Sequence, residues 1–590
     1  MKMRIYFLSM LASIGLILAG CSDDLGDGPG NEVLSGDKGY VKIAINLPTT
    51  SGQVTRSQND QFDDGSLNEY IVNNDDVYLL LFGGPSEEEA RLGSWYNIQT
   101  TFSNTEVDTD DNITTQSDVV QQIVKPTGDN TYALVVLNNN NNLGFEGLID
   151  GFDVGDAGNT VTIDGAPVST LASLQSALAK EVTAFIGAGS NSFTMTNAPI
   201  ATLSGSNDDL SSQSVSTLVK LEVFDNEDYA NAADPDEIYV ERVVAKVTVG
   251  YTSSLFTEDT NSKYYATLTD AAGQYSGDKV YLEGWYLNVT NKSTKFVRDV
   301  SNWSDWKNLE NSSSVDENRF FGTNSPFRVY WAIDGNYDNL SGDDDFRNAF
   351  NIGNGNNGLI SGANVFSTPA YCLENTMDYD HMMQKETTGI VFKMTYLMDG
   401  KDARTLFLIG DPKTSETLDD EGFLTEINKL LLEFDVNLVA KPEGGYYSTA
   451  NDMQKLFVDA QSSSLSLEQA EAIVEALAGQ QIRVYENGAT YYYASRIQHF
   501  GDTYCNIDPD YVEDVTEYGE EHLGRYGVVR NNWYEIVISS ISGPGRPTPP
   551  DPTHEDDPDY PKPDDPKDDA FINCRINILS WAKRTQNVDL

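Results

Sequence analysis

Hydrophobic and polar residues alternate over several short stretches of this chain. A period of two places the apolar side chains on one face of a strand, so the pattern predicts half-buried β-strands. The first strand is predicted at Tyr40–Pro48, with its apolar residues at Val41, Ile43, Ile45 and Leu47. Further strands are predicted at Val77–Phe82, Tyr132–Leu137, Phe193–Met195, Ser216–Phe224, Tyr239–Tyr251, Val280–Val289, Phe327–Ile333, Ile390–Leu397 and Trp533–Ile541.

Helical periodicity is found in only two places. Apolar residues recur at helical spacing over Leu171–Ile186, and Ser466–Ala478 has an apolar stripe as well. Ser466 and Gln469 form a capping box before the second stripe, and Gly479 is a typical helix stop after it. Many short strands with a few short helices predict a mainly β fold made of β-sandwich domains.

The C-terminal end combines a spacer with one more strand. From Gly543 to Asp569 the chain is rich in Pro and Asp, which predicts a stiff, solvated spacer because proline cannot support a sheet and like charges extend the chain. An alternating strand follows, with apolar residues at Ile572, Cys574, Ile576 and Ile578. A strand that follows a long spacer is free to pair with a distant partner.

The N-terminal end predicts export. Lys2 and Arg4 precede an apolar run of about 14 residues, which as a helix of about 21 Å is too short for a bilayer core of roughly 30 Å. This is typical of a signal peptide. The ending Leu18-Ala19-Gly20-Cys21 matches a bacterial lipobox, which predicts lipidation at Cys21. No later segment has 18 consecutive apolar residues, so we expect the rest to be soluble and exported.

The amino-acid composition excludes several classes of protein. The 590 residues include 91 Asp and Glu against 38 Lys and Arg, a formal net charge of −53 that would repel a phosphate backbone and excludes general nucleic-acid binding. Hydrophobic residues make up 39% of the chain, which is too many for a disordered acidic protein. With four histidines and four cysteines, metal ligands and catalytic bases are few.

No motif predicts an enzyme, a metal site or a cofactor. The G-x-G-x-x-G match at 353–358 lacks a buried strand before it and a helix after it, so a loop is predicted there. The acidic stretch at 108–112 lacks the glycine and the glutamate of a calcium loop. Acidic pairs are abundant, but nothing selects a glycosidase pair among them. Cys372 and Cys505 could form a disulfide, and Cys574 would then be a small apolar residue of the terminal strand.

Several segments, together with the lipobox, resemble Bacteroidales fimbrillins, and in particular the shaft subunits of short (minor) fimbriae, which are type V pili. These segments are Val240–Val247, Tyr330–Asp334, Tyr371–Thr376, Ile497–Phe500 and Tyr526–Asn531. The resemblance implies two transthyretin-like β-sandwich domains, expected at 57–252 and 253–542. Around them we expect a lipoprotein signal peptide at 1–21, a propeptide with the first strand at 22–56, a spacer at 543–570 and a donor strand at 571–590.

The resemblance also implies a maturation step. Fimbrillin precursors are cut after an arginine, and Arg56 matches that position, so Ser57 is the expected mature N-terminus. The cut would remove the first predicted strand and open a groove for the C-terminal strand of another subunit. The residues support this independently, because both strands carry four apolar residues at alternate positions. Burying four such side chains is worth on the order of 5–10 kcal/mol, and a backbone ladder sets the register.

The sequence therefore predicts a non-enzymatic subunit that polymerises into surface fimbriae by protease-triggered donor-strand exchange and supports adhesion and biofilm formation. Its expected partners are copies of itself, accessory tip and anchor subunits, an Arg-specific protease and a host or bacterial surface receptor, with membrane contact only through the precursor's lipid. We expect the precursor at the outer membrane and the mature protein in fimbriae. Two alternatives stay open: a monomeric glycan-binding surface lipoprotein, and a tip or anchor subunit of the same pilus.

Overall fold

The structure is a computed structural model in which part of the chain is described. The described residues are 38–47, 71–102, 115–146, 160–188, 192–203, 213–269, 272–301, 303, 327–329, 331–337, 340, 343–382, 386–436, 438, 442–460, 465–476, 481–500, 518–551 and 571–579. All of them lie in one compact unit that spans Asp37–Leu590.

The first large sheet contains the first predicted strand as an internal strand. Its strand order is β3-β2-β5-β10-β14-β1-β4, with β13 paired to β5. The strands are β1 (Lys38–Leu47), β2 (Val77–Gly84), β3 (Arg91–Asn97), β4 (Thr115–Val124), β5 (Asn130–Leu137), β10 (Met195–Asn197), β13 (Val219–Leu221) and β14 (Asp236–Arg242). Both faces of this sheet are buried, because Leu79 and Leu81 of β2 pack into one apolar core while Leu80 and Phe82 pack into another.

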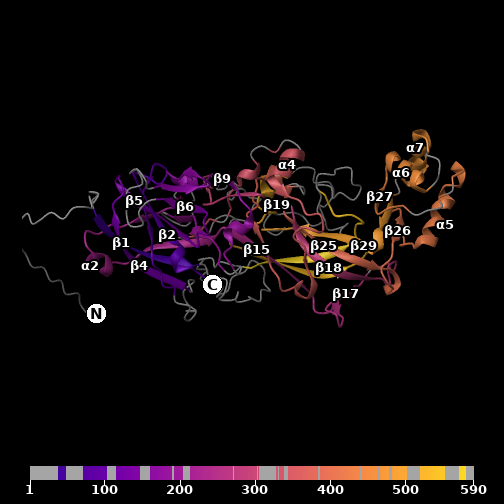
Figure 1. Ribbon diagram of the computed structural model, residues 1–590, viewed down its shortest axis with the longest axis horizontal. Helices are drawn as coiled ribbons and strands as arrows, with labels where there is room; N and C mark the ends of the chain where they lie inside the picture. The colour runs from indigo at the N-terminus through magenta and orange to yellow at the C-terminus, as the bar shows by residue number, and fades with distance from the viewer. Residues whose placement is uncertain are drawn as a thin grey trace, which may run out of the picture. The chain divides into compact units, whose positions relative to one another are not determined.

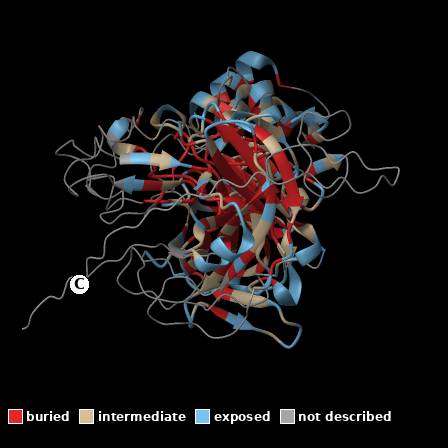
Figure 2. Ribbon diagram, turned by 90° about the vertical axis from the view of Figure 1, so that its left-hand side faces the viewer, coloured by how far each residue is buried: buried red, intermediate tan, exposed pale blue. Residues whose placement is uncertain are grey.

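Two further sheets form a sandwich. One has the order β24-β15-β30-β31 and the other β16-β17-β18-β25-β29, with β23 paired to β18. Their strands are β15 (Val244–Tyr251), β16 (Phe256–Glu258), β17 (Tyr264–Thr267), β18 (Lys279–Asn288), β23 (Ile360–Ser361), β24 (Ala370–Leu373), β25 (Gly389–Leu397), β29 (Ala489–Arg496), β30 (Trp533–Ile541) and β31 (Ile572–Leu579). Both sheets contribute side chains to the same apolar core, so they pack face to face. In Figure 2 the buried residues gather on strands in the interior of the view, and most exposed residues lie at its periphery.

Smaller elements surround these sheets. In the described part of the chain, the helices of four or more residues are α1 (Leu171–Leu174), α2 (Glu227–Ala232), α4 (Asp343–Ala349), α5 (Asp420–Leu430), α6 (Ala450–Ala460) and α7 (Leu467–Ala476), with a 3₁₀ turn at Val182–Phe185. The minor strands are β6 (Leu143–Glu146), β7 (Thr160–Ile163), β8 (Ala166–Pro167), β9 (Ala177–Ala179), β11 (Ile200–Leu203), β12 (Gln213–Ser216), β19 (Thr290–Asn291), β20 (Ser293–Lys295), β21 (Phe327–Arg328), β22 (Phe350–Asn351), β26 (Leu406–Ile409), β27 (Gly445–Tyr447) and β28 (Ile482–Tyr485).

A small α/β module is inserted between β25 and β29. It contains the sheet β26-β28-β27 and the helices α5, α6 and α7, which gather beside one another in Figure 1. Phe407, Phe423 and Ile473 belong to a separate apolar core that these elements share. The sequence predicted only α7 of this module. That helix is confirmed, and its capping box is formed: the Ser466 N–H donates to Gln469 Oε1 at 3.0 Å and the Gln469 N–H donates to Ser466 Oγ at 3.2 Å.

The mainly β fold with a few short helices is confirmed, and the predicted strands at Tyr40–Pro48 and Trp533–Ile541 are both present. The single strand predicted over Tyr239–Tyr251 is wrong. The chain leaves β14 at Arg242 and enters β15 at Val244, and these two strands belong to different sheets. Val243 is fully buried between them, and its N–H donates to the carbonyl of Thr194 at 3.0 Å. Apolar residues occur in both strands and at Val243 between them, so the sequence pattern did not reveal the change of sheet.

The helix predicted over Leu171–Ile186 is also wrong. The segment consists of α1, the strand β9 paired with β20, and the 3₁₀ turn. Leu171, Leu174 and Phe185 still pack into one apolar core, but they reach it from separate short pieces. The predicted strands at Ser216–Phe224 and Phe327–Ile333 are present only as short strands, β13 and β21.

The segment expected to be a solvated spacer begins as a packed strap. Residues 543–551 lie against β29: Tyr491 and Arg546 exchange two backbone hydrogen bonds of 2.8 Å, and the Tyr492 hydroxyl donates to the carbonyl of Gly543 at 2.7 Å. Asn288 of β18 donates to the carbonyl of Pro550. The prediction of solvation is therefore wrong for 543–551, because tyrosine and backbone donors on the sheet edge bind its carbonyl groups. The rest of the expected spacer, 552–570, lies outside the described residues.

Candidate functional site

The strand β1 occupies a position with strand partners on both sides. All ten of its residues pair antiparallel with β4, which lies near β1 in Figure 1. Ile43–Asn46 also pair parallel with Asp236–Tyr239 of β14. We call this position, between 236–239 of β14 and 115–124 of β4, the β1 slot. The side chains predicted to be displaced on maturation, Val41, Ile43, Ile45 and Leu47, are at most 2% exposed.

The backbone pairing of β4 and the burial of the neighbouring apolar core both depend on the strand that fills the β1 slot. β4 is the terminal strand of the sheet order and pairs with β1, so removing β1 leaves β4 without its ladder. Val119 and Ile123 of β4 and Ile238 of β14 share an apolar core with β1. An empty slot would therefore expose two unpaired backbone edges and an apolar core, and both favour the binding of another apolar strand.

The predicted donor strand is also present, and it lies in a different sheet from β1. β31 pairs antiparallel with β30, at the end of the strand order, so it has one strand neighbour among the described residues. Ile572 is 4% exposed, and the half-buried Cys574 and Ile576 pack against the sandwich core. The side chain of Ile578 lies outside the described residues. β31 is thus held by its own subunit as an edge strand.

The remaining predicted sites have mixed outcomes. Cys21, Arg56, Ser57 and Cys505 lie outside the described residues, so lipidation and cleavage stay predictions. Cys372 of β24 is buried, and burial raises the pKa of its thiol to about 12. Its pairing with Cys505 also stays a prediction.

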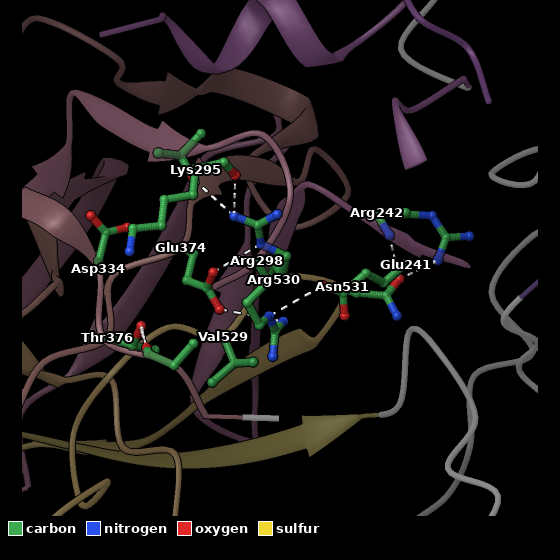
Figure 3. A network of polar contacts seen from close by, with 12 residues as sticks. Glu241, Arg242, Lys295, Arg298, Asp334, Glu374, Thr376, Val529, Arg530 and Asn531 are labelled. Carbon is green, nitrogen blue, oxygen red and sulfur yellow. Dashed lines mark hydrogen bonds and ion pairs between the residues drawn. The ribbon is translucent and has the colours of Figure 1, made fainter. Parts of the chain in front are cut away.

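A buried ionic cluster joins the first sheet to the sandwich, and Figure 3 shows it. Glu241 of β14 is fully buried and binds two arginines: Arg298 Nε lies 3.1 Å from Glu241 Oε1, and Arg328 Nε donates to Glu241 Oε2 at 2.8 Å. Arg298 Nη2 also lies 3.3 Å from Glu374 Oε1. Arg298 therefore bridges a carboxylate on β14 and a carboxylate that directly follows β24.

The other end of the cluster precedes β30. Arg530 Nε donates to Glu374 Oε2 at 2.8 Å, and its other nitrogens donate to Thr294 Oγ1 and to the carbonyls of Lys295 and Phe296. We call Glu241, Arg298, Arg328, Glu374 and Arg530 the ionic junction. Burial lowers the pKa of Arg298, while both glutamates oppose that shift. Removing charges from water is costly, so these groups depend on one another.

A neutral side chain adds a second link between β14 and β30. Asn531 Oδ1 accepts hydrogen bonds from Arg242 N at 3.2 Å and from Arg242 Nη1 at 3.1 Å, and both residues are fully buried. Asn531 has a φ of 62°, a left-handed conformation in which Asn is tolerated better than most residues. This position therefore selects Asn both for its backbone and for its amide oxygen.

Three of the segments that carry the resemblance meet at this junction. Glu241 and Arg242 come from Val240–Val247, Glu374 from Tyr371–Thr376, and Arg530 and Asn531 from Tyr526–Asn531. The contact among these segments was not predicted from the sequence. The available signal was charged residues placed inside or beside strongly apolar strands, where burial requires a partner.

Breaking the junction at its bridging residue should destabilise the fold. Arg298→Met leaves both glutamates under-compensated, and removing one partner of a buried pair typically costs about 3–5 kcal/mol. The matched control is Lys125→Met, which removes the exposed pair with Asp225 and should cost at most about 1 kcal/mol. Urea denaturation measures both values. An equal decrease in the free energy of unfolding in the two variants would contradict a structural role for the ionic junction.

Asp334, beside the junction, should make stability depend on pH. Burial, followed by the nearby charge of Glu374, raises the pKa of Asp334 from 3.8 to about 7. The folded chain then binds a proton that the unfolded chain lacks between about pH 4 and 7, so stability from this group falls as pH rises through that window. An asparagine at position 334 is always neutral and keeps an oxygen that accepts the hydrogen bonds from the backbone N–H and the side-chain amide of Asn336.

We therefore compare the free energy of unfolding of Asp334→Asn with that of the native chain at pH 4 and at pH 8. The variant should gain a few kcal/mol relative to the native chain on going from pH 4 to pH 8, at about 1.4 kcal/mol per unit of pKa difference. Denaturation at a series of pH values measures the difference, with the exposed Asp225→Asn as control. A pH-independent difference between Asp334→Asn and the native chain would show that Asp334 is ionised in the fold across this range.

Neither a metal site nor a membrane-spanning helix is found in the described part of the chain. No group of three or more His, Cys, Asp or Glu residues there could hold a metal ion. The described helices are too short or too polar to cross a membrane.

In the comparison with known proteins, a protein-family model matches the C-terminal part of the chain. Residues 483–587 match the family model of the fimbrillin C-terminal region, described as the type IV major fimbrial subunit protein. This match includes β29, β30 and β31, confirms the resemblance to fimbrillins, and supports a role as a fimbrial subunit. No curated protein sequence matches the chain.

Two solved structures of Porphyromonas gingivalis proteins are similar to this chain at low identity. A fimbrilin is 11% identical and the alignment covers 93% of this chain and 99% of that one, with a TM-score of 0.33. The tip fimbrial protein Mfa3 is 10% identical, and its alignment covers 92% of this chain and 100% of that one, with a TM-score of 0.29.

Proposed function

We propose that this chain, whose C-terminal part is similar to fimbrillin, is the structural shaft subunit of a surface fimbria. In this proposal it is exported as a lipoprotein precursor through Cys21, cut after Arg56, and polymerised by donor-strand exchange. The single observation that carries the proposal is that β1, which precedes Arg56, fills an internal slot with four fully buried side chains. β31 has the same apolar spacing but sits at a sheet edge.

Proteolysis supplies the switch. Before the cut, β1 is part of the same chain as its slot, so it competes at a high effective concentration against any strand from another subunit. After a cut at Arg56, β1 is held only by non-covalent contacts and can be displaced. The precursor is therefore a monomer, and assembly waits for an Arg-specific protease.

The exchange is favourable because the slot offers β31 more than its own sheet does. At the sheet edge β31 has one strand neighbour, whereas the β1 slot has β14 on one side and β4 on the other. Cys574 and Ile576 are half-buried at the edge, whereas Ile43 and Ile45 in the slot are fully buried. A second backbone ladder and deeper apolar burial both favour the slot.

The contact between subunits propagates because donor and slot are different surfaces. Such a heterologous contact does not close on itself and generates an open fibre. The net charge of −53 then describes a solvated fibre surface, while assembly is left to apolar strand faces. Adhesion and biofilm formation are the roles that such a non-enzymatic fibre would support, with tip and anchor subunits at its ends.

The N-terminus of the polymer tests this proposal. Material sheared from cells and recovered as a high-mass polymer should begin at Ser57. A monomer that keeps its lipid on Cys21, with no polymer containing cut chains, would contradict the proposal and favour a surface lipoprotein.

A further inference from the structure

We infer that the contact between Arg242 and Asn531 couples occupancy of the β1 slot to the hold on β31 within the same subunit. The inference rests on the proposed function, because it concerns how a precursor keeps its donor strand in place until β1 leaves. It is carried by an unbroken series of contacts from β1 through β14, Arg242, Asn531 and β30 to β31.

The first step lies in β14. Its ladder with β1 covers Asp236–Tyr239, and its ladder with β10 covers only Val240–Arg242. When β1 leaves, the first half of β14 loses these backbone hydrogen bonds. Arg242 lies in the same strand, three residues beyond the last residue that pairs with β1, so displacement of β14 reaches its side chain.

The second step crosses from the first sheet to the sandwich. Arg242 donates twice to Asn531 Oδ1, and the Asn531 N–H donates to the carbonyl of Val244 at 2.8 Å. The ionic junction lies beside this contact, with Glu241 on β14 and Arg530 next to Asn531. Because these groups are buried and paired, water cannot replace their hydrogen bonds when β14 shifts, so the shift changes the contacts of Asn531 and Arg530.

The third step reaches the donor strand. Asn531 precedes β30 by two residues, and the carbonyl of Asn532 accepts a hydrogen bond from the N–H of Lys246 in β15 at 3.0 Å. Trp533, the first residue of β30, pairs with Leu579 of β31. The same turn that receives Arg242 therefore sets the position of β30 against β31.

This arrangement gives the two states different contacts, as coupling requires. With β1 in its slot, β14 is fixed, Arg242 holds Asn531, and β30 is positioned for β31. With β1 gone, that hold weakens and β31 is released more readily. The donor strand is thus retained in the precursor and freed by the same event that opens the slot.

The test uses the full, uncut chain and reads two thiols, the half-buried Cys574 and the buried Cys372. Cys574 reports release of β31, and Cys372 in β24 reports global unfolding. Cys21→Ser and Cys505→Ser remove the other thiols. β1 is loosened with Ile45→Ala, and rates of modification by a small thiol reagent are compared with those of Ile163→Ala, a buried β7 residue that serves as control.

The link is cut with Asn531→Gly, which removes the amide but tolerates the positive φ. Its matched control is Asn487→Gly, which has a φ of 52° in an exposed turn. We expect Ile45→Ala to speed modification of Cys574 by roughly 5-fold or more, the lower end of typical coupling, without a matching change at Cys372. In the Asn531→Gly background this increase should be lost, and in the Asn487→Gly background it should persist.

Three outcomes would overturn the inference. No change in the modification rate of Cys574 in Ile45→Ala would show that the two strands are independent. An equal increase in the Asn531→Gly background would place the coupling elsewhere, and equal increases at Cys574 and Cys372 would show global unfolding. The experiment involves neither cleavage nor polymer, so these failures are distinguishable from failure of the proposed function.

Discussion

Ile576→Asp should abolish polymer while leaving a folded, exported subunit. At the sheet edge Ile576 is half-buried, so water can reach a charge there. In the β1 slot the same side chain would take a position equivalent to Ile43 or Ile45, both fully buried. An unpaired carboxylate at such a position costs several kcal/mol, and each 1.4 kcal/mol is about a tenfold loss of binding.

The matched control is Arg91→Asp, at an exposed position of β3 outside both the donor strand and the β1 slot. It introduces the same side chain away from the subunit contact and should leave a substantial amount of polymer. Deletion of 571–590 should act like Ile576→Asp, although it also uncovers the edge of β30. Polymer quantified from sheared cells measures all three, and fibres of normal yield from the deletion variant would show that β31 is not the donor.

Arg56→Ala should trap an uncut, lipidated monomer. The substitution removes the side chain that an Arg-specific protease recognises, so β1 stays covalently attached and keeps its slot. We expect the polymer to disappear and a full-length precursor to accumulate in the membrane fraction. Arg91→Ala, at the exposed start of β3, is the control and should mature normally. Polymer built of uncut Arg56→Ala chains would refute proteolysis as the switch.

The strands that carry the proposal could be predicted from the sequence. Alternation over Tyr40–Pro48 marked β1, and alternation over 572–578 marked β31, because a period of two survives wherever one face of a strand is buried. The limits of single elements were less predictable. The stretch Tyr239–Tyr251, predicted as one strand, contains parts of two strands of different sheets. Periodicity carries no information about which sheet a strand joins.

The ionic junction and the strap could not be predicted for a related reason. Glu241, Glu374 and Arg530 are far apart in the sequence and meet only when the first sheet packs against the sandwich. Their burial depends on that tertiary contact, which composition does not report. Likewise, the prolines of 543–551 indicate a segment outside any sheet, but not that the tyrosines of β29 would bind its carbonyl groups.

A disulfide between subunits tests most directly whether β31 of one copy occupies the β1 slot of another. If β31 enters in the direction of β1, Cys574 takes the place of Ile43, opposite Val119. If it enters reversed, Cys574 takes the place of Ile45, opposite Ser117. The Cα atoms of residues that face each other across an antiparallel ladder lie about 4.5–5.5 Å apart, which is within the Cα–Cα range of disulfides.

The measurement is oxidation of polymers built from single variants in a Cys505→Ser background. We predict that either Val119→Cys or Ser117→Cys gives a ladder of reductant-sensitive oligomers, and that the exposed Asp118→Cys gives none. Polymers that form normally but give no ladder with either inward-facing cysteine would contradict donor-strand exchange into the β1 slot.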